Sequence, residues 1–202
     1  GDLEKAKVIL AGTDINSQDH LGYTLLYKAV FYNRLNFVEY FFELGANVNL
    51  SDIEGLAPLH VAVLENLPGM IKILKDKGAD IEAKDDYGYT PLHLAADQGS
   101  FNASQQLIYA GANVNSRSDW GGTPLHASVA NKNFDLIRLL INDGAKLGLK
   151  DRLGRTSLHW VAEKGDLAIA KFLLLKGAAP NLPDNDGETA LHEAAKWGHL
   201  KM

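Results

Sequence analysis

The chain has 202 residues, a formal net charge of −5, no cysteine, and 46% hydrophobic residues. The lack of cysteine excludes a disulfide framework, a thiol nucleophile and a cysteine-ligated metal site. No apolar run approaches the roughly 18 residues that span a bilayer, so we expect no direct membrane insertion. Charges of both signs are mixed along the chain, so we expect no nucleic-acid partner. The lack of cysteine fits an intracellular, cytoplasmic setting, which we expect for this chain.

A glycine recurs every 33 residues, at Gly22, Gly55, Gly88, Gly121, Gly154 and Gly187. A strict period of this length indicates one structural unit that is copied and stacked into a single domain over 1–202. In chain order the units are a partial repeat over 1–18, full repeats over 19–51, 52–84, 85–117, 118–150 and 151–183, and a partial repeat over 184–202.

Each full repeat reads as a tight turn followed by two short helices. In the third copy, Asp85 and Gly88 have turn chemistry, and Thr90 and Pro91 predict the N-cap and first position of a helix. Gly99 marks the end of that helix, and a second apolar helix follows. The ends of the chain are predicted as parts of repeats: the second helix and exit turn of a preceding copy over 1–16, and the start of a second helix from residue 198. Helices of about ten residues are unstable alone, so neighbouring repeats must cover them.

The run Thr-Pro-Leu-His-Leu-Ala at 90–95 recurs in phase, with its leucine in six copies and its histidine in five. This run resembles the signature of the ankyrin repeat, and the resemblance covers 1–202. It implies an all-α solenoid of stacked helix-turn-helix units with β-hairpin loops. It also implies a non-catalytic protein–protein interaction module, part of a larger scaffold, regulator or effector. Its protein or peptide ligand would meet the hairpin tips and first helices on a concave face.

The positions that would face such a partner are rich in aromatic and apolar side chains, which are typical interface anchors. We predict an apolar anchor toward the N-terminal half and polar contacts further along. The same side chains could instead pack on one another across adjacent hairpins, and this alternative stays open. The candidate partner-binding residues are Leu21, Tyr23, Phe31, Tyr32, Ile53, Leu56, Tyr87, Tyr89, Trp120, Arg152 and Arg155.

The seven histidines suggest a metal site, but five of them occupy one register of the repeat. Packed helices lie roughly 8–10 Å apart, whereas zinc ligands lie about 2 Å from the ion, so successive histidines cannot share one ion. We predict instead that each bonds the turn beside it. Turn chemistry also accounts for part of the acidic pairs at 85–86 and 184–186. Since no hydrolase, protease or nucleotide-binding motif is present, we predict no enzyme, no cofactor and no metal.

Two other functions stay open. Proteins similar to ankyrin repeats are hydroxylated at the asparagine of a Gly-Ala-x-Val-Asn turn, which Asn49 and Asn115 match. The chain could also be the targeting arm of an enzyme or channel lying outside this segment. We expect a monomer. Ala57 replaces the capping threonine of the second repeat, and Pro68 alters the start of its second helix, so this repeat should be the least stable layer.

Overall fold

The computed structural model describes residues 12–201, and all regular structure in that range is helical. The helices are α2 (Leu25–Phe31), α3 (Leu35–Glu43), α4 (Pro58–Leu64), α5 (Pro68–Asp76), α6 (Pro91–Gln98), α7 (Phe101–Tyr109), α8 (Pro124–Ala130), α9 (Phe134–Asn142), α10 (Ser157–Lys164), α11 (Leu167–Leu175) and α12 (Ala190–Lys196). The predicted all-α solenoid is confirmed. The hairpin loops contain no β-strand within 12–201.

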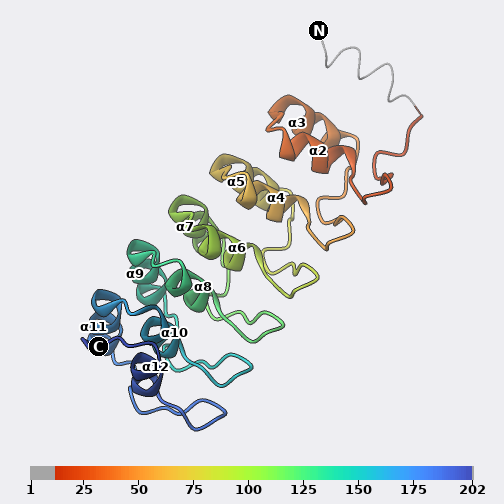
Figure 1. Cartoon of the computed structure of the whole chain (residues 1–202). Helices are drawn as coiled ribbons and strands as arrows, with labels where there is room; N and C mark the ends of the chain where they lie inside the picture. Colours follow the sequence, from red (N-terminus) through yellow and green to blue (C-terminus); the bar gives the residue numbers. More distant parts are fainter. Residues whose placement is uncertain (1–11, 202) are drawn as a thin grey trace.

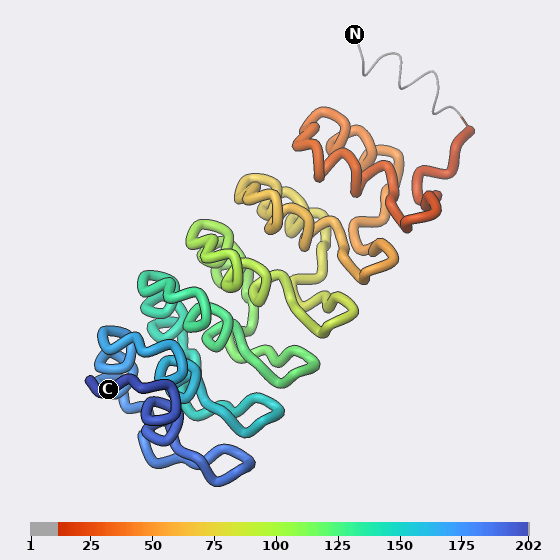
Figure 2. The backbone as a smooth tube through the Cα atoms, in the orientation of Figure 1, coloured from red at the N-terminus to blue at the C-terminus, as the bar shows by residue number. Residues whose placement is uncertain are grey.

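The helix pairs stack one behind another into a curved array (Figure 1). The first helix of each repeat lies beside the hairpin loops, and the second helix lies on the other side. Each of the first helices from α2 to α10 packs against the neighbouring first helices and against its own second helix, as α6 does with α4, α8 and α7. The last first helix, α12, packs against α10. The loops project from the same side of the array as successive rungs (Figure 2).

The core is a line of equivalent leucines at the centre of the stack. Leu59, Leu92 and Leu125 are at most 1% exposed, because a first helix lies on both sides of each. The equivalent Leu191 in α12 is 69% exposed. The register alone therefore does not bury this leucine, and burial depends on the repeat that follows.

Each hairpin tip packs closely on the turn of the hairpin before it. Gly88 has φ of +72°, and a Cβ at this position would lie 2.7 Å from the backbone nitrogen of Asp119 in the next hairpin. The same amide donates a hydrogen bond to the Tyr87 carbonyl at 3.0 Å. The turn glycine is thus favoured for two reasons, since other residues adopt the left-handed conformation only with strain and their Cβ would collide with the next hairpin.

The histidines of the repeat bond adjacent repeats together. His93 Nε2 lies 3.1 Å from the Gly122 carbonyl of the next hairpin, and His126 Nε2 lies 3.2 Å from the Arg155 carbonyl. A carbonyl only accepts, so Nε2 carries the proton and Nδ1 accepts from the backbone N–H and hydroxyl of the preceding threonine. Burial lowers the pKa of His93 and His126 to about 4. The predicted structural role of these histidines is confirmed.

Helix boundaries differ from the sequence prediction in detail. The helices have seven to nine residues, fewer than the expected ten. Pro68 opens α5 at the position where its missing N–H costs nothing. Lys132 adopts φ of +55° at a helix end where other copies have Asn or Gly. Residues 198–201 form no helix, in contrast to the prediction. The helix predicted in the first part of 1–16 lies outside the described residues up to position 11, and residues 12–16 contain turns, in agreement with the predicted exit turn.

Replacing the turn glycines should separate backbone strain from hairpin stacking. Gly187 has φ of +82° but no atom near its hypothetical Cβ, whereas Gly88 has both constraints. We expect Gly88→Ala to lower the free energy of unfolding by clearly more than Gly187→Ala, where strain alone costs roughly 1–2 kcal/mol. Urea unfolding followed by circular dichroism measures both. Equal losses would show that stacking of the hairpin adds nothing.

The array should lose stability in mild acid. The unfolded chain protonates His93 and His126 near pH 6.5, while the native state keeps them neutral down to about pH 4. The unfolded state binds more protons in this window, so the free energy of unfolding falls as the pH falls, by roughly 1.4 kcal/mol per pKa unit and histidine. Urea midpoints at pH 7.0 and 4.5 test this. His93→Gln removes one of the two groups, so this variant should lose less stability between the two pH values than the wild-type chain. An equal loss in both chains would contradict this assignment.

The second repeat should exchange its amide hydrogens faster than the third. The Ala57 N–H donates to His60 Nδ1 at 3.0 Å, but the hydroxyl bond that Thr90 makes to His93 has no counterpart there. We expect Ala57→Thr to raise protection in α4 by about 1 kcal/mol in hydrogen exchange. Equal protection of α4 and α6 in the wild-type chain would contradict this prediction.

Candidate functional site

The predicted partner-binding residues lie on hairpin tips and on the ends of first helices. The hairpin loops that carry most of them project from one side of the array (Figure 2). Six of these residues are exposed, with Ile53 at 62% and Tyr87 at 67%. The exposed set is Leu21, Phe31, Tyr32, Ile53, Tyr87 and Arg152, and the half-buried set is Tyr23, Leu56, Tyr89, Trp120 and Arg155.

Aromatic side chains of the third to fifth repeats form one continuous cluster. Trp120 Nε1 donates a hydrogen bond to the Tyr89 hydroxyl at 2.7 Å. The rings of Tyr87 and Tyr89 lie 6.3 Å apart, and those of Trp120 and Trp160 lie 5.2 Å apart. We call Tyr87, Tyr89, Trp120 and Trp160 the central aromatic cluster. Its members pack across adjacent repeats, as the packing alternative predicts, and still present surface to solvent. Their role in binding a partner stays a prediction.

Trp160 belongs to the cluster although the sequence did not place it there. Its Nε1 donates to Asp151 at 3.1 Å, and the Arg155 guanidinium lies 4.8 Å from its ring centroid. Arg155 also pairs with Asp151 at 3.1 Å and with Glu163 at 3.3 Å. The signal in the sequence was the large side chain itself, at a position where a smaller residue is usual.

A second aromatic group lies in the first repeat. Tyr23 and Tyr27 stack with ring centroids 4.6 Å apart, and the Tyr27 hydroxyl donates to Asp52 at 2.7 Å. Burial, together with this hydrogen bond, raises the pKa of Tyr27. Lys28 bonds Asp19 at 2.6 Å and holds the pKa of that carboxyl at about 2. Tyr27 stands in the histidine register, so the sequence marked it as irregular but not as part of a surface.

Carboxylates surround the central aromatic cluster. Burial raises the pKa of Tyr89, and the negative charges of Asp97 and Asp85 add to the shift, against the hydrogen bond from Trp120. Asp85 is committed to its turn, since one of its oxygens accepts the N–H groups of Tyr87 and Tyr89 at 2.9 and 2.8 Å. Asp97 lies exposed at the end of α6.

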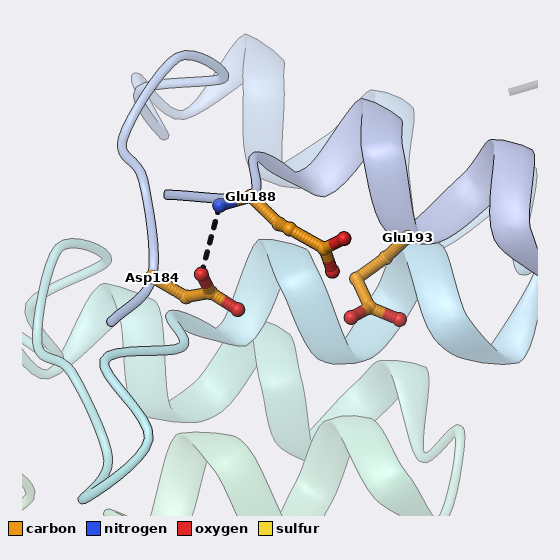
Figure 3. A group of neighbouring side chains, drawn as sticks. All are labelled: Asp184, Glu188 and Glu193. Carbon is orange, nitrogen blue, oxygen red and sulfur yellow. Dashed lines mark hydrogen bonds between the residues drawn. The ribbon is translucent and has the colours of Figure 1, made fainter. Parts of the chain in front are cut away.

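Three acidic side chains of the last repeat come close to one another (Figure 3). Ligand oxygens of Asp184, Glu188 and Glu193 lie within 4.8 Å of one another. Asp184 accepts the Glu188 N–H at 2.9 Å, as the turn requires. Glu193 accepts a bond from Trp197 at 3.0 Å and pairs with Lys196 at 3.5 Å. These contacts account for the group as part of a turn and a helix, and the absence of a metal stays a prediction.

The two candidate hydroxylation sites bridge adjacent repeats. The Asn115 amide donates to the Gly144 carbonyl at 3.0 Å and accepts from the Lys146 N–H at 2.8 Å. Asn49 makes the equivalent bonds to Gly78 and Asp80 at 3.2 and 2.9 Å. Both ends of each amide are occupied, which gives these asparagines a structural role. Their hydroxylation stays a prediction.

The known proteins that are similar to this chain contain the same type of repeat. Within 12–201, no helix has the length and apolar character needed to cross a bilayer. A crystal structure of the ankyrin repeat domain of Bcl-3, which is described as a unique member of the IkappaB protein family, is similar to this chain. The two chains share 30% sequence identity, the match covers 89% of this chain and 82% of that chain, and the TM-score is 0.81. A search of curated proteins found no match. The family model for ankyrin repeats (3 copies) matches residues 1–85, 68–151 and 125–202, and the chain therefore belongs to the ankyrin repeat family.

Proposed function

We propose that this chain is a non-catalytic module that binds a protein or peptide on the face formed by its hairpin tips and first helices. Ankyrin repeats are generally protein–protein interaction modules, and stacked repeats offer extended concave surfaces for binding. The observation that supports this face most is the central aromatic cluster. We further propose that the chain acts as a monomer in the cytoplasm, without nucleic acid.

The central aromatic cluster has the properties of a preorganised anchor. Its rings are held by the bond between Trp120 and Tyr89 and by the bond between Trp160 and Asp151, so little side-chain entropy remains to be lost on binding. Aromatic side chains also bring a large apolar area and a polar end into one contact. Exposed aromatics that are rigid before binding are common hot spots at interfaces.

Where a repeat contains both, its neighbouring threonine and histidine are of the residue types that form a nucleophile and its base in some enzymes. The Thr90 hydroxyl lies 2.9 Å from His93 Nδ1, within the reach of a nucleophile and its base. Both residues are at most 1% exposed, however, and the other ring nitrogen is bound to a carbonyl. The same arrangement recurs at Thr123 and Thr156, each with its own histidine. We therefore assign these pairs to structure and propose no enzymatic activity.

Removing the exposed side chains of the face should remove binding without unfolding the array. We expect the double variant Ile53→Ala, Tyr87→Ala to lose partners that the wild-type chain captures from cell extract, since hot-spot truncations cost about 2 kcal/mol or more. Affinity capture with quantitative mass spectrometry measures this. Tyr109→Ala is the matched control, because Tyr109 is 73% exposed at the end of α7, away from the hairpins. Identical partner lists for all three chains would place binding elsewhere.

A further inference from the structure

The central repeats have a one-sided charge pattern on the proposed binding face. Each repeat offers five equivalent positions there, three on the hairpin tip and two at the end of the first helix. In the second to fourth repeats these positions contain no lysine or arginine, and cations appear among them in the fifth repeat, as Arg152, Arg155 and Lys164. The carboxylates at the central positions are Glu54, Glu65, Asp86, Asp97 and Asp119.

These five carboxylates are available to a partner. All five residues are exposed. The ion pairs within residues 12–201 involve other carboxylates, on Asp19, Asp151, Glu163, Glu188 and Glu193. Asp97 accepts a bond from the Asn131 amide at 3.1 Å, which leaves its second oxygen free of any described partner. Within residues 12–201, these five carboxylates are therefore left without an ion pair.

The basic side chains at the base of the same hairpins bind backbone carbonyls and not the carboxylates of the tips. Lys84 Nζ donates to the Arg117 carbonyl at 2.9 Å, Arg117 Nη2 donates to the Lys150 carbonyl at 2.5 Å, and Lys150 Nζ donates to the Pro183 carbonyl at 2.6 Å. Each of these side chains binds the backbone of the next repeat at the same register. They stabilise the stack and leave the carboxylates of the tips unpaired.

We propose that the second to fourth repeats bind an extended, cationic peptide segment of a partner protein, with lysine or arginine side chains placed between Asp86, Asp97 and Asp119 and over the rings of Tyr87 and Trp120. This inference rests on the proposed function and specifies its ligand. A cation gains from both groups at once, through charge-assisted bonds to carboxylate and through attraction to the face of an aromatic ring.

The distance between neighbouring repeats also sets the spacing that we expect between basic residues in the bound peptide. Neighbouring helices in packed arrays lie roughly 8–10 Å apart, and an extended chain advances about 3.3 Å per residue. A segment running along the face therefore presents one cation to each repeat when its basic residues are about three positions apart. Charges at an exposed face act mainly on association, so binding should weaken as salt increases.

A selection from random peptides tests the proposal. A phage library of random 12-residue peptides is selected on the immobilised 202-residue chain, and an enriched peptide is synthesised with a fluorescent label. We expect enrichment of lysine and arginine about three positions apart. Fluorescence anisotropy then compares the wild-type chain with the triple variant Asp86→Asn, Asp97→Asn, Asp119→Asn, for which we expect roughly tenfold weaker binding from the loss of three exposed charge contacts.

The matched control is Glu43→Gln, Asp76→Asn, Asp143→Asn, which removes three exposed carboxylates at the ends of second helices. It should keep the wild-type affinity within about twofold, since these charges lie away from the hairpin tips. Enriched peptides without basic residues, or equal affinity for both triple variants, would overturn the cationic ligand. If the enriched peptides lack basic residues but still lose affinity for the variant Ile53→Ala, Tyr87→Ala, the proposed binding face stands and only the cationic ligand is overturned. Peptides that require neither group, or no enrichment, would overturn both proposals.

Discussion

The close stacking of each hairpin on the turn before it is the contact on which the rest of the structure depends. At Gly88 the next hairpin comes so near that a single added carbon would collide with its backbone. This approach also places the carbonyl of residue 122 within reach of His93. Helix packing, hairpin stacking and the histidine bond therefore form together at the joints that follow the second to fifth repeats. At the first joint the Tyr27 hydroxyl bonds Asp52 instead. Each repeat is stable only with its neighbour in place.

The same joint explains how the candidate binding face is assembled from equivalent positions of successive repeats. Because exposed tip residues such as Ile53 and Tyr87 lie outside the buried core, the residues at these positions can change without disturbing it. Equivalent positions then form rows along the array, and a row can be aromatic in one repeat and charged in the next. The bond from Trp120 to Tyr89 and the ring contact with Trp160 show how neighbouring rows are combined into one rigid surface.

The period made the fold predictable, whereas the site could be predicted only in part. Turn glycines, capping threonines and the helix-end register follow from local chemistry, and a fixed spacing repeats the glycine six times and the threonine five times. Register also placed Tyr87 and Ile53 correctly on exposed tips. It could not show that Tyr89 and Trp120 would be half-buried, or that Trp160 would join them. The burial of Tyr89 and Trp120 and the position of Trp160 depend on contacts between residues of different repeats. Each of these contacts occurs once along the array, so it leaves no periodic signal in the sequence.

The uniform joint has a consequence for how such a chain can evolve. His93 reaches residue 122 and His126 reaches residue 155, so both bonds connect positions that are 29 residues apart. Gain or loss of one whole 33-residue block preserves this offset at every remaining joint, whereas gain or loss of a few residues within a block breaks it. Duplication can thus lengthen the array by one layer at a time, and each new layer brings a fresh set of tip residues on which selection can act.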